Sequence, residues 1–298
     1  MILVTGETLL DVFQDAHQKN HYQSYPGGAP ANVAVMLHAL NLPVRFFTVV
    51  GTDERGNQLY QTLEKLGLDT SQVFRDATVK TPFAFVEQSS TGPHFEFYHF
   101  NAPLKRYPVH FDFKSLDEFQ LVVGSGVIVT NKAGYQFQKK LFKKAHQKQC
   151  LIALDFNIRP LLTEDMVKLR KRLIKLSTYA DVIKISTDDY GYFTDHITQS
   201  PFDVFDLKKT AQVILTDGAK GAKLYTQEAV YETHGIPVDA IDTTGAGDAF
   251  MGAFLKGYLT DPNHHEHNLS DANKKAALST TFKGAMTALM QFKDPQSL

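Results

Sequence analysis

The chain has 298 residues, of which 43% are hydrophobic and 21% charged, a composition typical of a globular protein and a length sufficient for one large α/β domain or two medium ones. Its 31 basic and 32 acidic residues leave a formal net charge of −1, which gives no reason to expect a nucleic acid as partner. The single cysteine, Cys150, excludes an internal disulfide, and neither a basic leader nor an apolar run of about 20 residues is visible, so we expect a cytoplasmic protein without membrane contact.

Apolar strands alternate with amphipathic helices over most of the chain. Alternation of this kind predicts a mostly parallel sheet with helices on both faces. In chain order, we expect a strand at 2–5, a helix at 30–40, a strand at 45–50, a helix at 56–66, a strand at 121–127, a helix at 134–147, a strand at 151–155, a helix at 163–177, and strands at 181–185 and 212–216.

Two regions interrupt this rhythm. Residues 12–25 are polar and aromatic without helical periodicity, and residues 73–105 contain two short alternating runs separated by turn residues at 89–93. Together they fit a small β-sheet that projects from the main domain. The simpler alternative is an edge hairpin.

The most informative segment is Asp-Thr-Thr-Gly-Ala-Gly-Asp at 242–248, followed by an apolar helical run. Glycines leave main-chain N–H groups open, and the N-terminus of a helix carries partial positive charge, so such a turn attracts anions. Asp248 would then lie beside the bound anion, where a carboxylate can take the proton of a hydroxyl that attacks a phosphoryl group. The simpler alternative is a glycine turn whose Asp248 only complements the helix dipole.

This D-T-x-G-A-G-D signature resembles that of the PfkB, or ribokinase-like, family of carbohydrate kinases, and the resemblance continues over nearly the whole chain. It implies one ribokinase-like α/β domain over residues 1–298, with three α/β/α layers and the sheet from 12–25 and 73–105 as a lid over the sugar site. The catalytic residues that it implies are the base Asp248 and an anion hole at Gly245, Ala246 and Gly247.

Gly-Gly-Ala-Pro-Ala-Asn at 27–32 is similar to the family's first signature, whose glycines and asparagine contact the sugar. Considered alone, Asn32 could equally cap the helix that follows. The D-x-N-x-R segment at 155–159 follows a buried strand, at the end where ligands of open α/β sheets bind; an ion pair between Asp155 and Arg159 is the alternative. By resemblance, the sugar-binding residues are Asp11, Gly27, Gly28, Asn32, Tyr98 and Arg159.

The nucleotide side is implied by resemblance alone. A T-x-G-x-x-G element and a C-terminal helix provide the implied nucleotide-binding residues, which are Thr216, Gly218, Gly221 and Asn273. Asp189 stands where many relatives carry the glutamate of an N-x-x-E motif that organises hydrated Mg²⁺, and Ser186 replaces the asparagine. Some relatives place a monovalent cation at the positions of Asp242 and Thr244. The implied cofactors are therefore ATP and Mg²⁺, with K⁺ as a further ion.

The implied substrate is a small sugar. The segments at 6–11 and 27–32 are most similar to fructokinases, which phosphorylate the 6-hydroxyl of fructose, while the D-x-N-x-R-P element also fits 2-keto-3-deoxygluconate kinase. His99 stands where both groups commonly have arginine, which leaves another sugar open. A non-catalytic sugar-binding regulator would be expected to lose Asp248 or its glycines, which are present. The resemblance also implies a homodimer through the lid.

One further cluster could bind a metal ion. The run His-His-Glu-His at 264–267 lies in a predicted polar loop that does not orient the side chains, so we expect no metal there.

Overall fold

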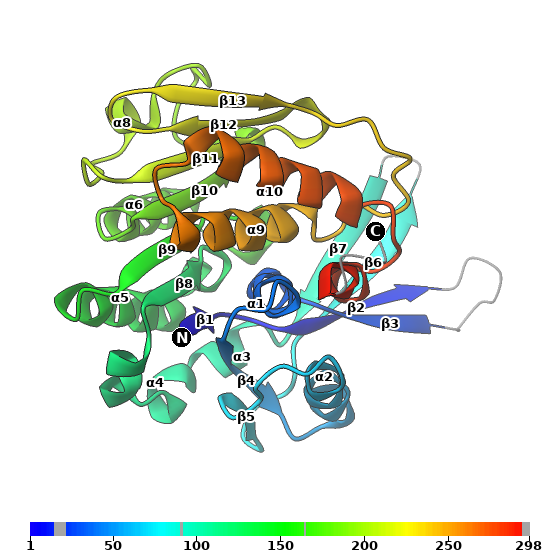
Figure 1. Ribbon diagram of the computed structural model, residues 1–298. Helices are drawn as coiled ribbons and strands as arrows, with labels where there is room; N and C mark the ends of the chain where they lie inside the picture. The colour runs from blue at the N-terminus through cyan, green and yellow to red at the C-terminus, as the bar shows by residue number, and fades with distance from the viewer. Residues whose placement is uncertain (15–21, 90–91, 164, 294–298) are drawn as a thin grey trace.

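The computed structural model of the protein describes residues 1–14, 22–89, 92–163 and 165–293. At its centre is a large sheet with a layer of helices on each face (Figure 1). The strands of this sheet are β1 (Ile2–Thr5), β4 (Val44–Gly51), β5 (Val73–Asp76), β8 (Leu121–Ser125), β9 (Leu151–Asp155), β10 (Val182–Ser186), β11 (Gln212–Thr216), β12 (Gly221–Tyr225) and β13 (Val230–His234). Within the described ranges they lie in the order β13-β12-β11-β10-β9-β8-β1-β4-β5, and all neighbours from β11 to β5 pair in parallel.

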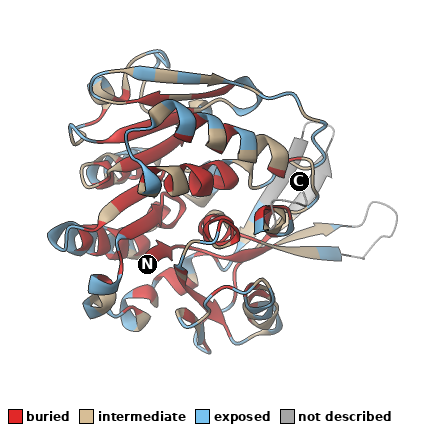
Figure 2. Ribbon diagram, viewed as in Figure 1, coloured by how far each residue is buried: buried red, intermediate tan, exposed pale blue. Residues whose placement is uncertain are grey.

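Two hydrophobic cores lie on the two faces of the sheet, because successive side chains of a strand point to opposite sides. Ile2 and Val4 of β1 pack into the core of one face, and Leu3 packs into the other. The first core holds α1 (Ala29–Ala39), α9 (Ala246–Thr260) and α10 (His265–Ser279), and the second holds α5 (Lys132–Gln147) and α6 (Met166–Ser177). Figure 2 shows the central strands as almost entirely buried.

The remaining helices are short or lie at the border of the sheet. They are α2 (Glu54–Lys65), α3 (Asn101–Leu104), α4 (Tyr107–His110), α7 (Thr187–Tyr190), α8 (Pro201–Val204) and α11 (Ala285–Leu289). The 3₁₀ helices are Phe113–Glu118, Val127–Thr130, Pro160–Leu162, Gly218–Lys220 and Met290–Lys293.

The predicted three-layer α/β/α arrangement with a mostly parallel sheet is confirmed. The predicted strands at 151–155 and 212–216 coincide with β9 and β11. The strand expected at 121–127 ends earlier, at Ser125, because the chain turns into a 3₁₀ helix at Val127–Thr130. The edge strands β5 and β13 were not expected, since exposed or half-buried edge positions tolerate a mixed sequence without a clear apolar run. The strand β12, which lies between β11 and β13, was not expected either.

A smaller sheet projects from the main body (Figure 1). It consists of β2 (Leu9–Gln14), β3 (Tyr22–Gly27), β6 (Phe83–Ser89) and β7 (Gly92–Tyr98), in the order β3-β2-β6-β7. This sheet corresponds to the predicted projecting sheet, and we call it the lid. Residues 15–21 and 90–91 of the predicted lid and turn lie outside the described residues.

The second predicted lid segment, 73–105, begins too early. Its first part, Val73–Asp76, instead forms β5, which pairs in parallel with β4 at the border of the central sheet. The reason is that the side chain of Val73 packs into the first core. Its last part, Asn101–Leu104, is α3, whose Leu104 belongs to the second core. The lid is therefore smaller than the sequence suggested.

Two further observations concern membranes and metals. Among the described residues, no helix combines the length and the apolar character that a membrane crossing requires. The histidine run at 264–267 is not a polar loop as expected, because α10 begins at His265. No group of three or more His, Cys, Asp or Glu side chains suited to a metal ion is found in the part of the chain that the structure describes.

Candidate active site

A cavity of about 420 Å³ lies where the lid meets the carboxyl ends of β1 and β9 and the start of α9. Ligands of open α/β sheets bind at this end of the strands. The cavity is lined by several residues to which the sequence assigned roles, namely Asp11, Gly28, Asn32, Arg159, Thr244, Gly245 and Asp248. Its apolar wall includes Leu9, Phe97, Phe100 and Ile158. Segments that are far apart in the chain therefore meet at one site.

Asp248 lies in the first turn of α9, as the sequence predicted. The helix begins after Gly245, whose φ of 82° is left-handed, and a Cβ at this position would lie 2.9 Å from the Cβ of Ala285. A residue other than glycine would therefore be strained and crowded here. The side chain of Asp248 lines the cavity although the residue is only 8% exposed. This position combines access to a ligand with very little access to water.

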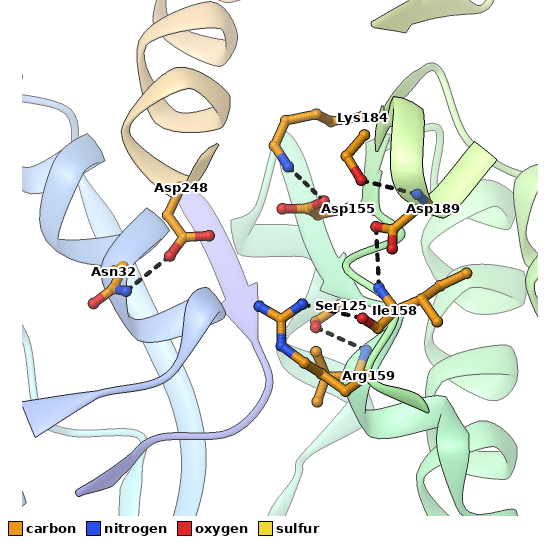
Figure 3. A network of polar contacts seen from close by, with 10 residues as sticks. Asn32, Ser125, Asp155, Ile158, Arg159, Lys184, Asp189 and Asp248 are labelled. Carbon is orange, nitrogen blue, oxygen red and sulfur yellow. Dashed lines mark hydrogen bonds and ion pairs between the residues drawn. The ribbon is translucent and has the colours of Figure 1, made fainter. Parts of the chain in front are cut away.

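The amide of Asn32 holds the carboxylate of Asp248. Its Nδ2 donates a hydrogen bond of 2.8 Å to Asp248 Oδ2, across the gap between α1 and α9 (Figure 3). Asn32 does not cap α1, because the N-cap position is Gly28. Its Oδ1 is buried and has no hydrogen-bond partner among the described residues. Asn32 thus orients Asp248 and keeps one buried acceptor without a partner.

The environment raises the pKa of the Asp248 carboxyl to about 7. Burial is the main cause, since it disfavours the charged form, and the nearby carboxylate of Asp155 adds to it. The hydrogen bond from Asn32 and the positive charges of Lys184 and Arg159 oppose the shift. A carboxyl group with a pKa near neutrality can take up and release a proton at physiological pH.

A buried ion pair lies next to Asp248. Lys184 Nζ is 2.8 Å from Asp155 Oδ1, and both side chains are less than a tenth exposed (Figure 3). A Cβ built on Gly247 would lie 3.5 Å from Lys184 Nζ, so the ammonium group lies beside the glycine turn. Sequence reasoning missed Lys184; its signal was a lysine at the centre of the otherwise apolar strand β10.

Arg159 does not form the ion pair with Asp155 that the sequence left open as an alternative. Its Nη1 donates to the carbonyl oxygen of Ile158, and the guanidinium group lies between Asp248 and the end of β9 (Figure 3). Because Arg159 lines the cavity, its positive charge is available to an anion or to hydroxyl groups there.

Asp189 follows β10, in the short helix α7. Its Oδ2 accepts a hydrogen bond from the backbone N–H of Ile158, and burial raises its pKa. Ser186, which replaces the family's asparagine, caps α7 by accepting from the N–H of Asp189. Asp155 Oδ2 is buried without a hydrogen-bond partner among the described residues. These carboxylate oxygens fit the donor type that Mg²⁺ prefers.

Asp242 organises the loop before α9. Its Oδ1 accepts from the N–H of Thr244, and its Oδ2 accepts from the N–H of Gly284. The two bonds connect the glycine turn to the start of α11. Thr244 lines the cavity, whereas Asp242 is not among its lining residues.

On the lid, Tyr98 does not line the cavity. Its neighbours Phe97 and Phe100 do, while the ring of Tyr98 is largely exposed and stacks on Phe83 with 4.7 Å between the ring centroids. Consecutive residues of a strand point to opposite faces, so a shift of one position separates the inward from the outward side chain. His99 likewise lies outside this cavity.

Asp11 lies in β2 and lines the cavity, where burial raises its pKa to about 6. Gly27 is not a lining residue, but a Cβ there would lie 2.5 Å from Asp11 Oδ2. Gly27 therefore leaves room for the carboxylate of Asp11. Glu7 also lines the cavity, although the sequence gave it no role within the Gly6–Asp11 segment.

The predicted nucleotide-binding residues lie away from this cavity. Thr216 ends β11, Gly218 lies in the following turn, and Gly221 begins β12. Asn273 is buried in α10 and donates from Nδ2 to the carbonyl oxygen of His234 at the end of β13, a bond of 2.8 Å. Asn273 thus connects α10 to the sheet.

Comparison with known proteins adds independent findings. A model of the pfkB family of carbohydrate kinases matches residues 1–291. A protein of Pyrococcus horikoshii described as a sugar kinase is 31% identical over 100% of this chain and 97% of its own, and its structure in complex with ATP gives a TM-score of 0.84 at 29% identity over 96% and 94% of the two chains. A fructokinase of Vibrio alginolyticus is 28% identical over 97% of this chain and 95% of its own. The crystal structure of a fructokinase from Xylella fastidiosa with bound ATP gives a TM-score of 0.84 at 25% identity, covering 100% and 99% of the two chains.

Proposed function

Because the chain belongs to the PfkB family of carbohydrate kinases and is an ATP-dependent carbohydrate kinase, we propose that it phosphorylates a primary hydroxyl of fructose to give fructose 6-phosphate. The observation that carries this proposal is the buried Asp248 at the start of α9, facing the cavity and held by Asn32. The fructokinase relatives favour fructose among the small sugars.

In the proposed reaction, Asp248 accepts the proton of the sugar hydroxyl while the hydroxyl oxygen attacks the γ-phosphorus of ATP and the bond to the ADP oxygen breaks. Backbone N–H groups at Gly245 and Gly247 stabilise the charge on the transferred phosphoryl group, an effect that is worth about 3–4 kcal/mol per donor. The N–H of Ala246 joins them once its 3.3 Å bond to the carbonyl oxygen of Thr243 opens. Lys184 lies beside this turn and adds a positive charge. Phe97 and Phe100 form an apolar wall that limits water at the reacting hydroxyl.

The nucleotide would lie beyond the cavity, toward Thr216, Gly218 and Gly221, with Asn273 supporting the wall of its site. Mg²⁺, when bound, neutralises phosphate oxygens. Asp189 and Asp155 would hold the hydrated ion, because their buried carboxylates supply oxygen donors beside the site.

A monovalent cation such as K⁺ beside Asp242 and Thr244 remains a prediction. Both carboxylate oxygens of Asp242 already accept hydrogen bonds from backbone N–H groups, so the ion would share these oxygens with them. The homodimer through the lid also remains a prediction.

The charges that line the cavity support an uncharged sugar over 2-keto-3-deoxygluconate. The lining residues include three carboxyl groups, of Glu7, Asp11 and Asp248, and one guanidinium group, of Arg159. At neutral pH Asp11, with a pKa of about 6, is mainly ionised, and Asp248, with a pKa of about 7, is partly ionised. A substrate carboxylate would meet these like charges inside the cavity, where their repulsion is stronger than in water. Fructose avoids this repulsion and offers several hydroxyls to the same groups.

A coupled ADP-release assay tests the substrate. Fructose, 2-keto-3-deoxygluconate, ribose, tagatose and nucleosides are compared at saturating ATP and Mg²⁺, and we expect the highest kcat/KM with fructose. NMR of the product should place the phosphate on the 6-oxygen. A higher kcat/KM with the sugar acid would replace fructose by the alternative substrate, and sugar binding without ADP release would favour a regulator.

The pKa of Asp248 predicts the acid limb of the pH profile. A base acts only when it is ionised, so a carboxyl whose pKa is raised to about 7 loses activity below pH 7, whereas an ordinary aspartate would stay active down to about pH 4. We expect kcat/KM for the sugar to fall about tenfold per pH unit between pH 6.5 and 5. Enzyme that is incubated at pH 5 and assayed at pH 8 controls for unfolding. A constant kcat/KM down to pH 5 would contradict this assignment.

A further inference from the structure

Glu7 lies two residues after the end of β1 and lines the cavity without any role in the reaction described above. It lines the cavity together with Asn32, Arg159 and Asp248, and it is only 5% exposed. Its Oε2 is fully buried and has no hydrogen-bond partner among the described residues. A carboxyl oxygen in this situation lacks the partner that buried polar groups normally have in a folded protein.

The surroundings of Glu7 determine its charge. Burial raises its pKa to about 8, and the carboxylates of Asp248 and Asp155 act in the same direction, while Arg159 and the backbone N–H of Glu7 itself oppose the shift. None of the ion pairs found among the described residues involves Glu7. At neutral pH the side chain is therefore mainly a protonated carboxyl group, which can donate one hydrogen bond and accept another.

We infer that Glu7 is a sugar-binding residue, whose carboxyl group forms hydrogen bonds with an oxygen of the uncharged substrate in the cavity. This inference rests on the proposed function. A sugar hydroxyl both donates and accepts, so it is complementary to a protonated carboxyl group and supplies the partner that Oε2 lacks. A carboxylate ligand would be complementary only in part, because it can accept from the protonated carboxyl group but cannot donate to it.

The alternative is a purely structural role, in which Glu7 supports the turn between β1 and β2. Such a role would affect the folding of the protein and both substrates alike. Sugar binding predicts a selective effect instead: the KM for the sugar changes, the KM for ATP does not, and an isosteric amide restores most of the affinity.

Steady-state kinetics of Glu7→Leu and Glu7→Gln separate the two roles. Leucine removes the hydrogen bonds at similar volume, so Glu7→Leu should raise the sugar KM at least about tenfold, which corresponds to about 1.4 kcal/mol of binding free energy. The KM for ATP should stay within about twofold. Glu7→Gln keeps a donor and an acceptor and should raise the sugar KM no more than about threefold. Glu64→Gln, at an exposed position of α2, is the matched control.

A folded Glu7→Leu protein with an unchanged sugar KM, or with equal changes in both KM values, would overturn the inference. The wild-type protein offers a second measurement if Glu7→Leu does not fold. With ¹³C-labelled glutamate, the carboxyl signal that disappears in Glu7→Gln should shift when the sugar is added, and no shift would also overturn the inference. A wild-type protein that turns over no sugar would instead refute the proposed function, so the two failures are distinguishable.

Discussion

Replacement of the base, Asp248→Asn, is expected to lower kcat at least about 10²-fold, with little change in the KM values for sugar and ATP. The carboxamide has nearly the same shape and can still accept the hydrogen bond from Asn32, but it cannot take a proton from the substrate hydroxyl. Loss of general-base catalysis typically costs this factor. The measurement is kcat in the coupled ADP-release assay, with sugar binding followed by calorimetry because the chain contains no tryptophan.

The same variant should be more stable than the wild type at high pH. The pKa of Asp248 is raised to about 7 in the folded protein, whereas it has its ordinary value near 4 in the unfolded chain. Between about pH 4 and pH 7 the folded protein therefore binds one proton at this group that the unfolded chain has largely lost. The contribution of this protonated group is complete below about pH 4 and is lost as the pH rises toward 7. We therefore expect Asp248→Asn to show a Tm that equals the wild-type value near pH 4 and exceeds it by a few degrees at pH 8.

These two results together distinguish a catalytic carboxylate from a structural one. A structural Asp248 would give a less stable variant whose activity falls only as far as its folded fraction. Near-normal kcat in a folded Asp248→Asn protein would contradict the proposed mechanism, whatever its stability.

The second large effect is expected at the glycine turn. Gly245→Ala should lower kcat about 10²-fold, because the backbone at this position has a left-handed φ of 82°, which strains any residue with a Cβ, and because the added methyl group would lie 2.9 Å from the Cβ of Ala285. The turn must shift to relieve this contact, and a shift of about 1 Å in a catalytic group can change the rate by this factor. The N–H groups would then no longer match the transferred phosphoryl group.

Gly67→Ala is the matched control for backbone strain. Gly67 also has a left-handed φ, of 81°, but it follows the end of α2, and the nearest atom to an added Cβ is Nε2 of the His38 side chain at 3.2 Å. Both variants should lose about 1–2 kcal/mol of unfolding free energy, the usual cost of this conformation. Only Gly245→Ala should lose activity per folded molecule. Equal kcat values for the two folded variants would remove the anion hole from the mechanism.

The sequence predicted the frame of the molecule and much of the cavity, because these features depend on local patterns. Buried runs such as 151–155 must form strands at the centre of the sheet, and a glycine turn before an apolar helix places Asp248 in its first turn. Tyr98 was predicted one position away from the side chain that lines the cavity, Phe97, because an alternating lid strand without a known register does not define its inner face.

Other features depend on contacts between distant segments. Lys184 is an ordinary strand residue in the sequence, and only the neighbouring strand β9 brings Asp155 to within 2.8 Å of it. Glu7 is likewise unremarkable until the surrounding segments bury its carboxyl group and raise its pKa. Asn32 could not be distinguished from a helix cap in the sequence, because its hydrogen-bond partner Asp248 lies 216 positions further along the chain, in another helix.

This long separation has a consequence for the synthesis of the protein. A ribosome releases α1 early, but the aspartate that its asparagine must hold is translated only when most of the polypeptide has already emerged. Contacts between such remote segments form late and slowly in folding. A nascent or prematurely terminated chain would therefore lack an oriented proton acceptor, and it could not consume cellular ATP before its translation is almost complete.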